Sequence, residues 1–101
     1  MTITQIRILG LFDNDDLVLQ IMNIIDDEIN TEFNVEIIPD GENTFFRVIV
    51  NGEFAKYTVQ NLINIINSLI GSGPYDAVQV VFVADENVTT INVEGDHDIV
   101  I

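Results

Sequence analysis

The sequence contains no cysteine and no tryptophan, and only three of its 101 residues are lysine or arginine. Without cysteine the chain cannot form a disulfide, a thiolate zinc site or a thiol nucleophile. Its 17 acidic residues outweigh the three basic ones, which gives a formal net charge of -14. Such a charge repels nucleic acids and anionic membrane surfaces and attracts basic proteins. We therefore expect neither direct nucleic-acid binding nor membrane binding.

The N-terminal sequence and the apolar runs give no sign of export or membrane insertion. MTITQIR lacks the basic segment and apolar stretch of a signal peptide, and the longest apolar run covers only residues 80–84. We expect a cytoplasmic protein of a bacterial host cell. The length of 101 residues and the hydrophobic content of 48% predict one folded domain over residues 1–101 rather than a disordered acidic tail.

Hydrophobic periodicity predicts the element order βαβββαββ. The expected helices begin near the acidic segment 13–16 and at Thr58, and they end near Asn30 and at Gly71. Asn51-Gly52 is a preferred type I′ hairpin turn and is expected to separate the third and fourth strands. The expected strands cover residues 3–12, 34–39, 44–50, 53–57, 77–84 and 88–93, with residues 99–101 as a further edge strand.

Two stretches with helical apolar spacing resemble each other, QIMNIIDDEI at residues 20–29 and NLINIINSLI at residues 61–70. They align with a shift of 41 residues, which suggests two βαββ units joined at Asn51-Gly52. Each unit connects two parallel strands through a helix. We therefore predict an α+β fold, a two-layer sandwich of a mixed β-sheet with two helices on one face.

The acidic residues are concentrated on the first helix and in the loops. This topology predicts two groups, one at the end of the sheet where the first strand finishes and one at the opposite end. As candidate residues for protein binding we take Asp13, Asp15, Asp16, Asp40, Glu42, Asp85 and Glu86 from the first group, and Asp26, Asp27, Glu28 and Glu32 from the second.

Three consecutive acids, Asp26, Asp27 and Glu28, occupy the C-terminal end of the first helix, where the helix dipole favours cations. No lysine or arginine on that helix offsets them. Residues that break a local rule without compensation are candidates for function. An acidic patch for a basic partner is one interpretation, and a solvated surface in an acidic lineage is the other. Asp16, Gln20, Asn23 and Asp27 follow helical spacing, which makes phosphate mimicry a further hypothesis.

Catalytic and metal-binding motifs are weak. His97 is the only histidine, no nucleophile-elbow sequence surrounds Ser68 or Ser72, and no glycine-rich phosphate loop occurs. The segment beginning at Asp13 lacks the glycine and glutamate that an EF-hand loop requires. We expect no enzyme, no cofactor and no functional metal.

As a whole, the chain resembles the small acidic inhibitors of phages and mobile elements, such as anti-CRISPR and DNA-mimic antirestriction proteins. The resemblance rests on length, absence of cysteine, element order and negative charge, and it has no diagnostic motif. It implies an inhibitor that binds a basic nucleic-acid-handling protein or complex and blocks its nucleic-acid channel. The alternatives are an immunity protein against a basic nuclease toxin and a structural protein that self-assembles, for example as a homodimer, through residues 77–84 or the uncharged face of the second helix.

Overall fold

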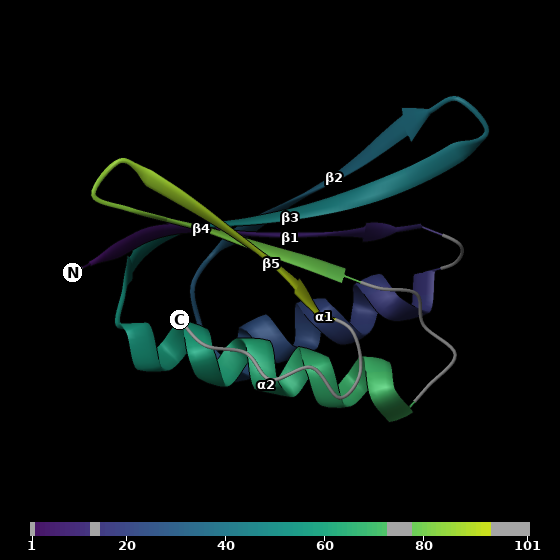
Figure 1. The fold of residues 1–101 in the computed structure, drawn as a ribbon. Helices are drawn as coiled ribbons and strands as arrows, with labels where there is room; N and C mark the ends of the chain where they lie inside the picture. Colours follow the sequence, from purple (N-terminus) through teal and green to yellow (C-terminus); the bar gives the residue numbers. More distant parts are fainter. Residues whose placement is uncertain (1, 13–14, 73–77, 94–101) are drawn as a thin grey trace.

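The computed structural model describes residues 2–12, 15–72 and 78–93. It contains two helices and five strands, and the predicted α+β class is confirmed (Figure 1). The helices are α1 (Asp15–Glu28) and α2 (Lys56–Ser72). The strands are β1 (Ile3–Leu11), β2 (Phe33–Asp40), β3 (Asn43–Phe54), β4 (Val78–Ala84) and β5 (Asn87–Val93). The expected strand at residues 99–101 lies outside the described residues.

The five strands form one sheet in the order β2-β3-β1-β4-β5, and all four neighbouring pairs are antiparallel. The prediction of a mixed sheet is therefore wrong in its pairing. Each helix does connect two strands that run in the same direction, β1 with β2 and β3 with β4. The strands of each pair are separated by one antiparallel strand, β3 in the first case and β1 in the second.

The expected hairpin turn at Asn51-Gly52 does not form, and β3 continues through it to Phe54. Neither residue has the positive φ that a type I′ turn needs. Instead, β1 pairs with β3 on both sides of the site, with Gln5 opposite Asn51 and Ile3 opposite Phe54. The expected third and fourth strands are thus one strand, because pairing with the central strand β1 outweighs the local turn preference.

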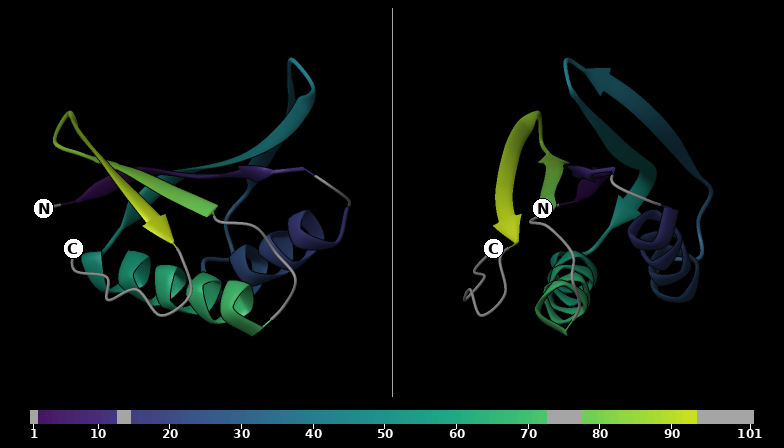
Figure 2. Two further views of the ribbon diagram at one scale, coloured as in Figure 1. Left: turned by 45° about the vertical axis from the view of Figure 1, so that its right-hand side comes forward. Right: turned by 90° about the vertical axis from the view of Figure 1, so that its right-hand side faces the viewer.

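Both helices lie on the same face of the sheet, as predicted (Figure 2). The hydrophobic core between the layers is built mainly from isoleucine, valine and leucine. Ile21 and Ile25 of α1 and Leu62 and Ile66 of α2 are buried, which confirms the apolar stripes that spacing predicts. Gly10 of β1 permits close packing in this core, because a Cβ atom there would lie 2.7 Å from the Phe46 ring.

Helix α2 begins two residues earlier than expected, at Lys56 rather than Thr58, and includes Gly71. Ala55 precedes the helix, and its carbonyl oxygen accepts hydrogen bonds from the N–H groups of Thr58 and Val59. Helix α1 ends at Glu28, and Asn30 follows with a positive φ of 54°, the left-handed conformation that often terminates a helix.

Candidate functional site

Helix α1 carries five of the candidate binding residues and no cation. Asp15 and Asp16 lie in its first turn, where the helix dipole favours negative charge. Asp26, Asp27 and Glu28 lie in its last turn, where the dipole opposes them. All five are exposed, as are Gln20 and Asn23 between them. We call the exposed set Asp15, Asp16, Gln20, Asn23, Asp26 and Asp27 the acidic face of α1.

The acids at the end of α1 differ in their surroundings. The Glu28 carboxylate accepts a hydrogen bond of 2.9 Å from Asn61 Nδ2 of α2, so it joins the two helices. Asp26 and Asp27 form no hydrogen bond or ion pair with any described residue. Their charges are therefore available to a partner, and the fold around them gives no compensation for the unfavourable dipole.

The two ends of the acidic face are well separated. Asp16 and Asp27 are 11 residues apart, which corresponds to about 16 Å along the helix axis. This separation exceeds the ~12 Å width of the major groove of DNA. A basic surface that normally contacts phosphates on both sides of a groove therefore has the dimensions to contact both ends of α1.

The other candidate acids lie in turns, and one pair lies at the opposite end from its predicted position. Asp40 and Glu42 flank the β2–β3 turn, and Asp85 and Glu86 form the β4–β5 turn. Asp85 and Glu86 were predicted to lie with Asp15, Asp16, Asp40 and Glu42. They do not, because β4 runs antiparallel to β1 and ends beside Ile3, at the start of β1.

The Asp85-Glu86 turn also has an unusual backbone. Its two residues connect Ala84 to Asn87 and have φ values of 50° and 68°. Two consecutive positive φ values define the type I′ hairpin turn, which normally contains Asn-Gly. A glutamate in the left-handed region is strained relative to glycine. These two acids are thus a second pair placed against local preference.

Glu32 is exposed between α1 and β2, near the C-terminal acids of α1. Asp13 lies outside the described residues. The acids are therefore divided among α1, its C-terminal connection and two hairpin turns at opposite ends of the sheet, rather than brought into one continuous patch.

Three exposed apolar residues near the acidic face were not predicted as functional. Leu19 of α1 is 54% exposed, and Val35 and Ile37 of the edge strand β2 are 37% and 48% exposed. Leu19 follows Asp15 by four residues and precedes Asp26 by seven, so Asp15, Leu19 and Asp26 lie on one stripe of the helix. Because Leu19 falls outside the buried stripe, helical spacing alone provided a signal for its exposure.

The face of the sheet opposite the helices is a second candidate surface. Alternation with the buried residues places apolar side chains on this side, and directly paired residues share a face. We call this surface the open face. It consists of Gln5, Arg7, Leu9, Leu11, Asn34, Glu36, Ile38, Phe45, Arg47, Ile49, Asn51, Gln79, Val81, Val83, Val88 and Thr90. Among the described residues, no other element covers it (Figure 2).

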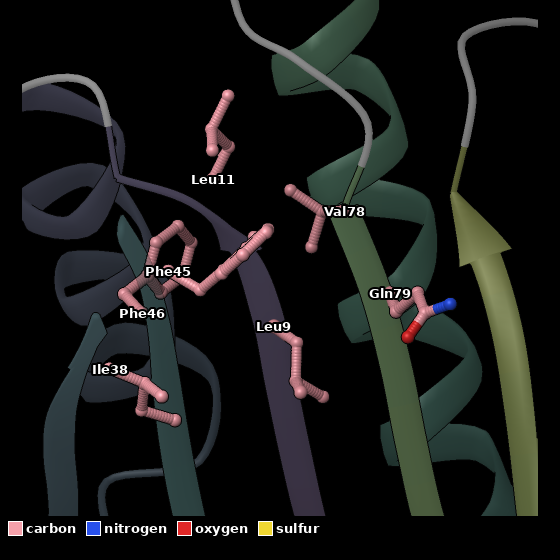
Figure 3. Close-up of a pocket in the computed structure, with 8 residues that line it drawn as sticks. Leu9, Leu11, Ile38, Phe45, Phe46, Val78 and Gln79 are labelled. Carbon is pink, nitrogen blue, oxygen red and sulfur yellow. The ribbon is translucent and has the colours of Figure 1, made fainter. Parts of the chain in front are cut away.

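A hollow of about 370 Å³ lies at the end of the open face near Leu11. Leu9, Ile38 and Phe45 reach it from three neighbouring strands, and Gln79 contributes from β4 (Figure 3). The described residues that line it are mostly apolar and include no carboxylate, histidine or hydroxyl side chain, so this lining suits an apolar side chain.

An ion pair crosses two neighbouring strands of the sheet. Arg47 of β3 and Glu36 of β2 form a salt bridge on the open face, and the two residues are directly opposite in the sheet. Lys56 lies at the start of α2 rather than in a strand, which corrects its predicted position. The Nε atom of Arg7 is buried and has no hydrogen-bond partner in the described part of the chain.

No group of three or more acidic or histidine side chains in the described ranges is arranged to hold a metal ion. His97, Asp96 and Asp98 lie outside those ranges. None of the described helices combines the length and apolar character needed to cross a membrane. A comparison with known protein families and with characterised proteins finds no match to this chain.

Proposed function

We propose that this protein is a non-enzymatic inhibitor that binds a basic nucleic-acid-handling protein or complex through the acidic face of α1. One observation carries the proposal. Asp26 and Asp27 are exposed, have no partner among the described residues, and lie where the helix dipole opposes them, on a helix without a single cation. Stability gives no reason for that arrangement, whereas a surface complementary to lysine and arginine does.

The mode of action follows from charge and shape. The negative field of the chain accelerates encounter with a basic groove. On contact, carboxylates at both ends of α1 pair with cations that otherwise hold phosphates. Leu19, exposed between them, provides apolar contact that charge alone lacks. The target's nucleic-acid channel is then occupied. The target is expected in the cytoplasm of a bacterial host.

The test is affinity capture from a bacterial lysate at low and high salt, followed by mass spectrometry. We expect a basic nucleic-acid-binding protein that is lost at high salt, because screening weakens exposed charge pairs. The captured protein is then purified, and its nucleic acid should be displaced by a stoichiometric amount of the inhibitor. Capture of a nuclease toxin would instead assign the alternative immunity function.

A matched pair of variants locates the binding surface. Asp26→Lys with Asp27→Lys should weaken binding by roughly 100-fold, because it places cations against cations. Asp40→Lys with Glu42→Lys makes the same charge change at the β2–β3 turn and should alter affinity by no more than roughly 10-fold, through long-range steering. Equal losses in both variants, or capture that is insensitive to salt, would refute the role of α1.

A further inference from the structure

The open face is apolar to a degree that is unusual for an uncovered sheet. Antiparallel sheets with one solvated face normally alternate apolar and polar residues. Here the apolar residues Leu9, Ile38, Phe45 and Ile49 point away from the core and remain partly exposed to solvent. Val81 is 8% exposed and belongs to no part of the core cluster. Polar residues such as Gln5 and Asn34 interrupt this face, but apolar side chains gathered on a solvent-facing sheet are a candidate interaction site.

The charge of this surface indicates which partner fits it. Two of the three basic residues of the chain, Arg7 and Arg47, lie on the open face. Arg47 lies directly opposite Glu36, Arg7 lies on the next strand, and Asp40 and Glu53 lie at the margins of the face. The open face is therefore close to electrically neutral, whereas the acidic face of α1 repels another acidic molecule. A second copy of this chain, with its charge of -14, meets the least repulsion here.

We propose that the open face binds the open face of a second copy, forming a homodimer with the helices on the outside. The outer surface of α2 is also uncharged, but its exposed or half-buried residues include Gln60, Asn61, Asn64 and Ser68. These polar side chains are well hydrated and provide little hydrophobic driving force. Only the open face combines apolar area with near-neutral charge in the described part of the chain.

Three features of the open face suit a symmetric contact. Val88 is 60% exposed and lies opposite Val83, so it projects from the open face at the end away from the hollow. In a two-fold contact the same pair of surfaces meets twice, so Val88 of each copy can face the hollow of the other. The turns of both hairpins extend away from the helices (Figure 2). If the strands of the two copies cross at a steep angle, the two turns of one copy lie on either side of the other copy.

The arginines add a polar contact to this interface. Arg7 Nε lacks a hydrogen-bond partner within the described ranges, while 44% of the Glu36 side chain remains exposed beside Arg47. The buried Nε of Arg7 is not accessible to another copy. A carboxylate accepts several hydrogen bonds, however, so Glu36 can retain Arg47 and also accept a bond from a terminal guanidinium nitrogen of Arg7 of the second copy. The dimer would leave two acidic faces of α1 on its outer surfaces. This inference does not depend on the proposed function.

Sedimentation equilibrium of the intact chain tests the dimer directly. We expect twice the chain mass of 11.3 kDa and a dissociation constant that falls as salt rises, because salt screens the repulsion between two acidic copies. Binding to a basic partner has the opposite salt dependence, so the two proposals can fail separately. A monomer at every protein and salt concentration would overturn the dimer.

Two leucine variants make the same chemical change on different faces. Leu9→Glu places a charge in the open face and should weaken dimerisation by roughly 100-fold, because a buried unpaired carboxylate is costly. Leu19→Glu on α1 should leave the dimer intact. A dimer unaffected by Leu9→Glu, or one dissociated equally by Leu19→Glu, contradicts the assignment of the interface.

A measurement on the unmodified chain covers the case in which Leu9→Glu does not fold. A soluble paramagnetic probe broadens the NMR signals of exposed methyl groups. With rising protein concentration, the methyls of Leu9, Val83 and Val88 should become protected, while those of Leu19 should not. Protection that is absent, or that appears on Leu19 instead, would reject the open face as the contact.

Discussion

Helices α1 and α2 lie side by side on one face of the sheet and bury equivalent residues (Figure 1). The shift of 41 residues that aligns their sequences superimposes Ile21 on Leu62 and Ile25 on Ile66, and all four are fully buried. The exposed sides differ. Helix α1 carries five acids and no cation, whereas α2 carries Lys56 and no acid. The sheet requires the same apolar stripe from both helices, but it does not require their charges.

The comparison separates residues that the core requires from residues that the core does not explain. Burial against a common sheet explains the residues that the helices share. It does not explain why Asp26, Asp27 and Glu28 of α1 stand where α2 has Asn67, Ser68 and Leu69. Helix α1 ends at Glu28, whereas α2 continues to Ser72, so only the acids of α1 lie wholly within a last turn. Burial against the sheet does not account for those acids, and the proposed function rests on them.

The largest expected effect tests whether the two buried stripes are equivalent. Ile25→Ala and Ile66→Ala should each lower the free energy of unfolding by about 2–5 kcal/mol, because each leaves a cavity in the core. Urea denaturation followed by circular dichroism gives both values. Because the two side chains are buried to the same extent, the losses should be similar. A loss at Ile25 below half of that at Ile66 would show that α1 is held more loosely than α2.

A smaller effect is expected at the β4–β5 turn, where acids again occur against local preference. Glu86→Gly should raise the free energy of unfolding by about 1 kcal/mol, because glycine adopts the positive φ of 68° without strain. Gly41, with a φ of 63° in the β2–β3 turn, provides the control. Gly41→Ala should lower stability by a similar amount. Thermal unfolding of both variants checks the opposite signs, and destabilisation by Glu86→Gly would show that the turn does not have this conformation in solution.

The sequence predicted the helices and strands better than it predicted which strands lie next to each other in the sheet. The buried stripes of both helices and the α+β class followed from periodicity, because side chains on one face recur at fixed spacing. The pairing of neighbouring strands did not follow from periodicity. A helix that connects two parallel strands specifies their direction, but it does not exclude a third strand between them. The misplaced Asp85 and Glu86 are a consequence, since their end of the sheet depends on the direction of β4 relative to β1.

The hairpin turn predicted at Asn51-Gly52 was wrong for a different reason. Its turn preference is local, whereas the competing hydrogen bonds come from β1, more than 40 residues away in the chain. Short-range signals cannot report that competition. The candidate site was predictable to the extent that it depends on one helix. The acids of α1 belong to one helix whose bounds followed from spacing, while the open face joins residues from five strands and required the sheet order.

The smallest effect addresses the charge difference itself. Asp27 aligns with Ser68, so exchanging them tests the same position in the two helices. Asp27→Ser should raise the free energy of unfolding by about 0.3–1 kcal/mol, because it removes a negative charge from the C-terminal end of α1. Ser68→Asp should lower it by a smaller amount in α2, because Ser68 lies just before the last turn of a helix that ends at Ser72. Serine and aspartate have similar helix propensities, so the dipole and the overall negative charge dominate both changes. Urea denaturation at low salt gives the values, and both should shrink at high salt. If Asp27→Ser destabilised the chain, Asp27 would contribute to folding, and the argument that α1 retains its acids for a partner would lose its basis.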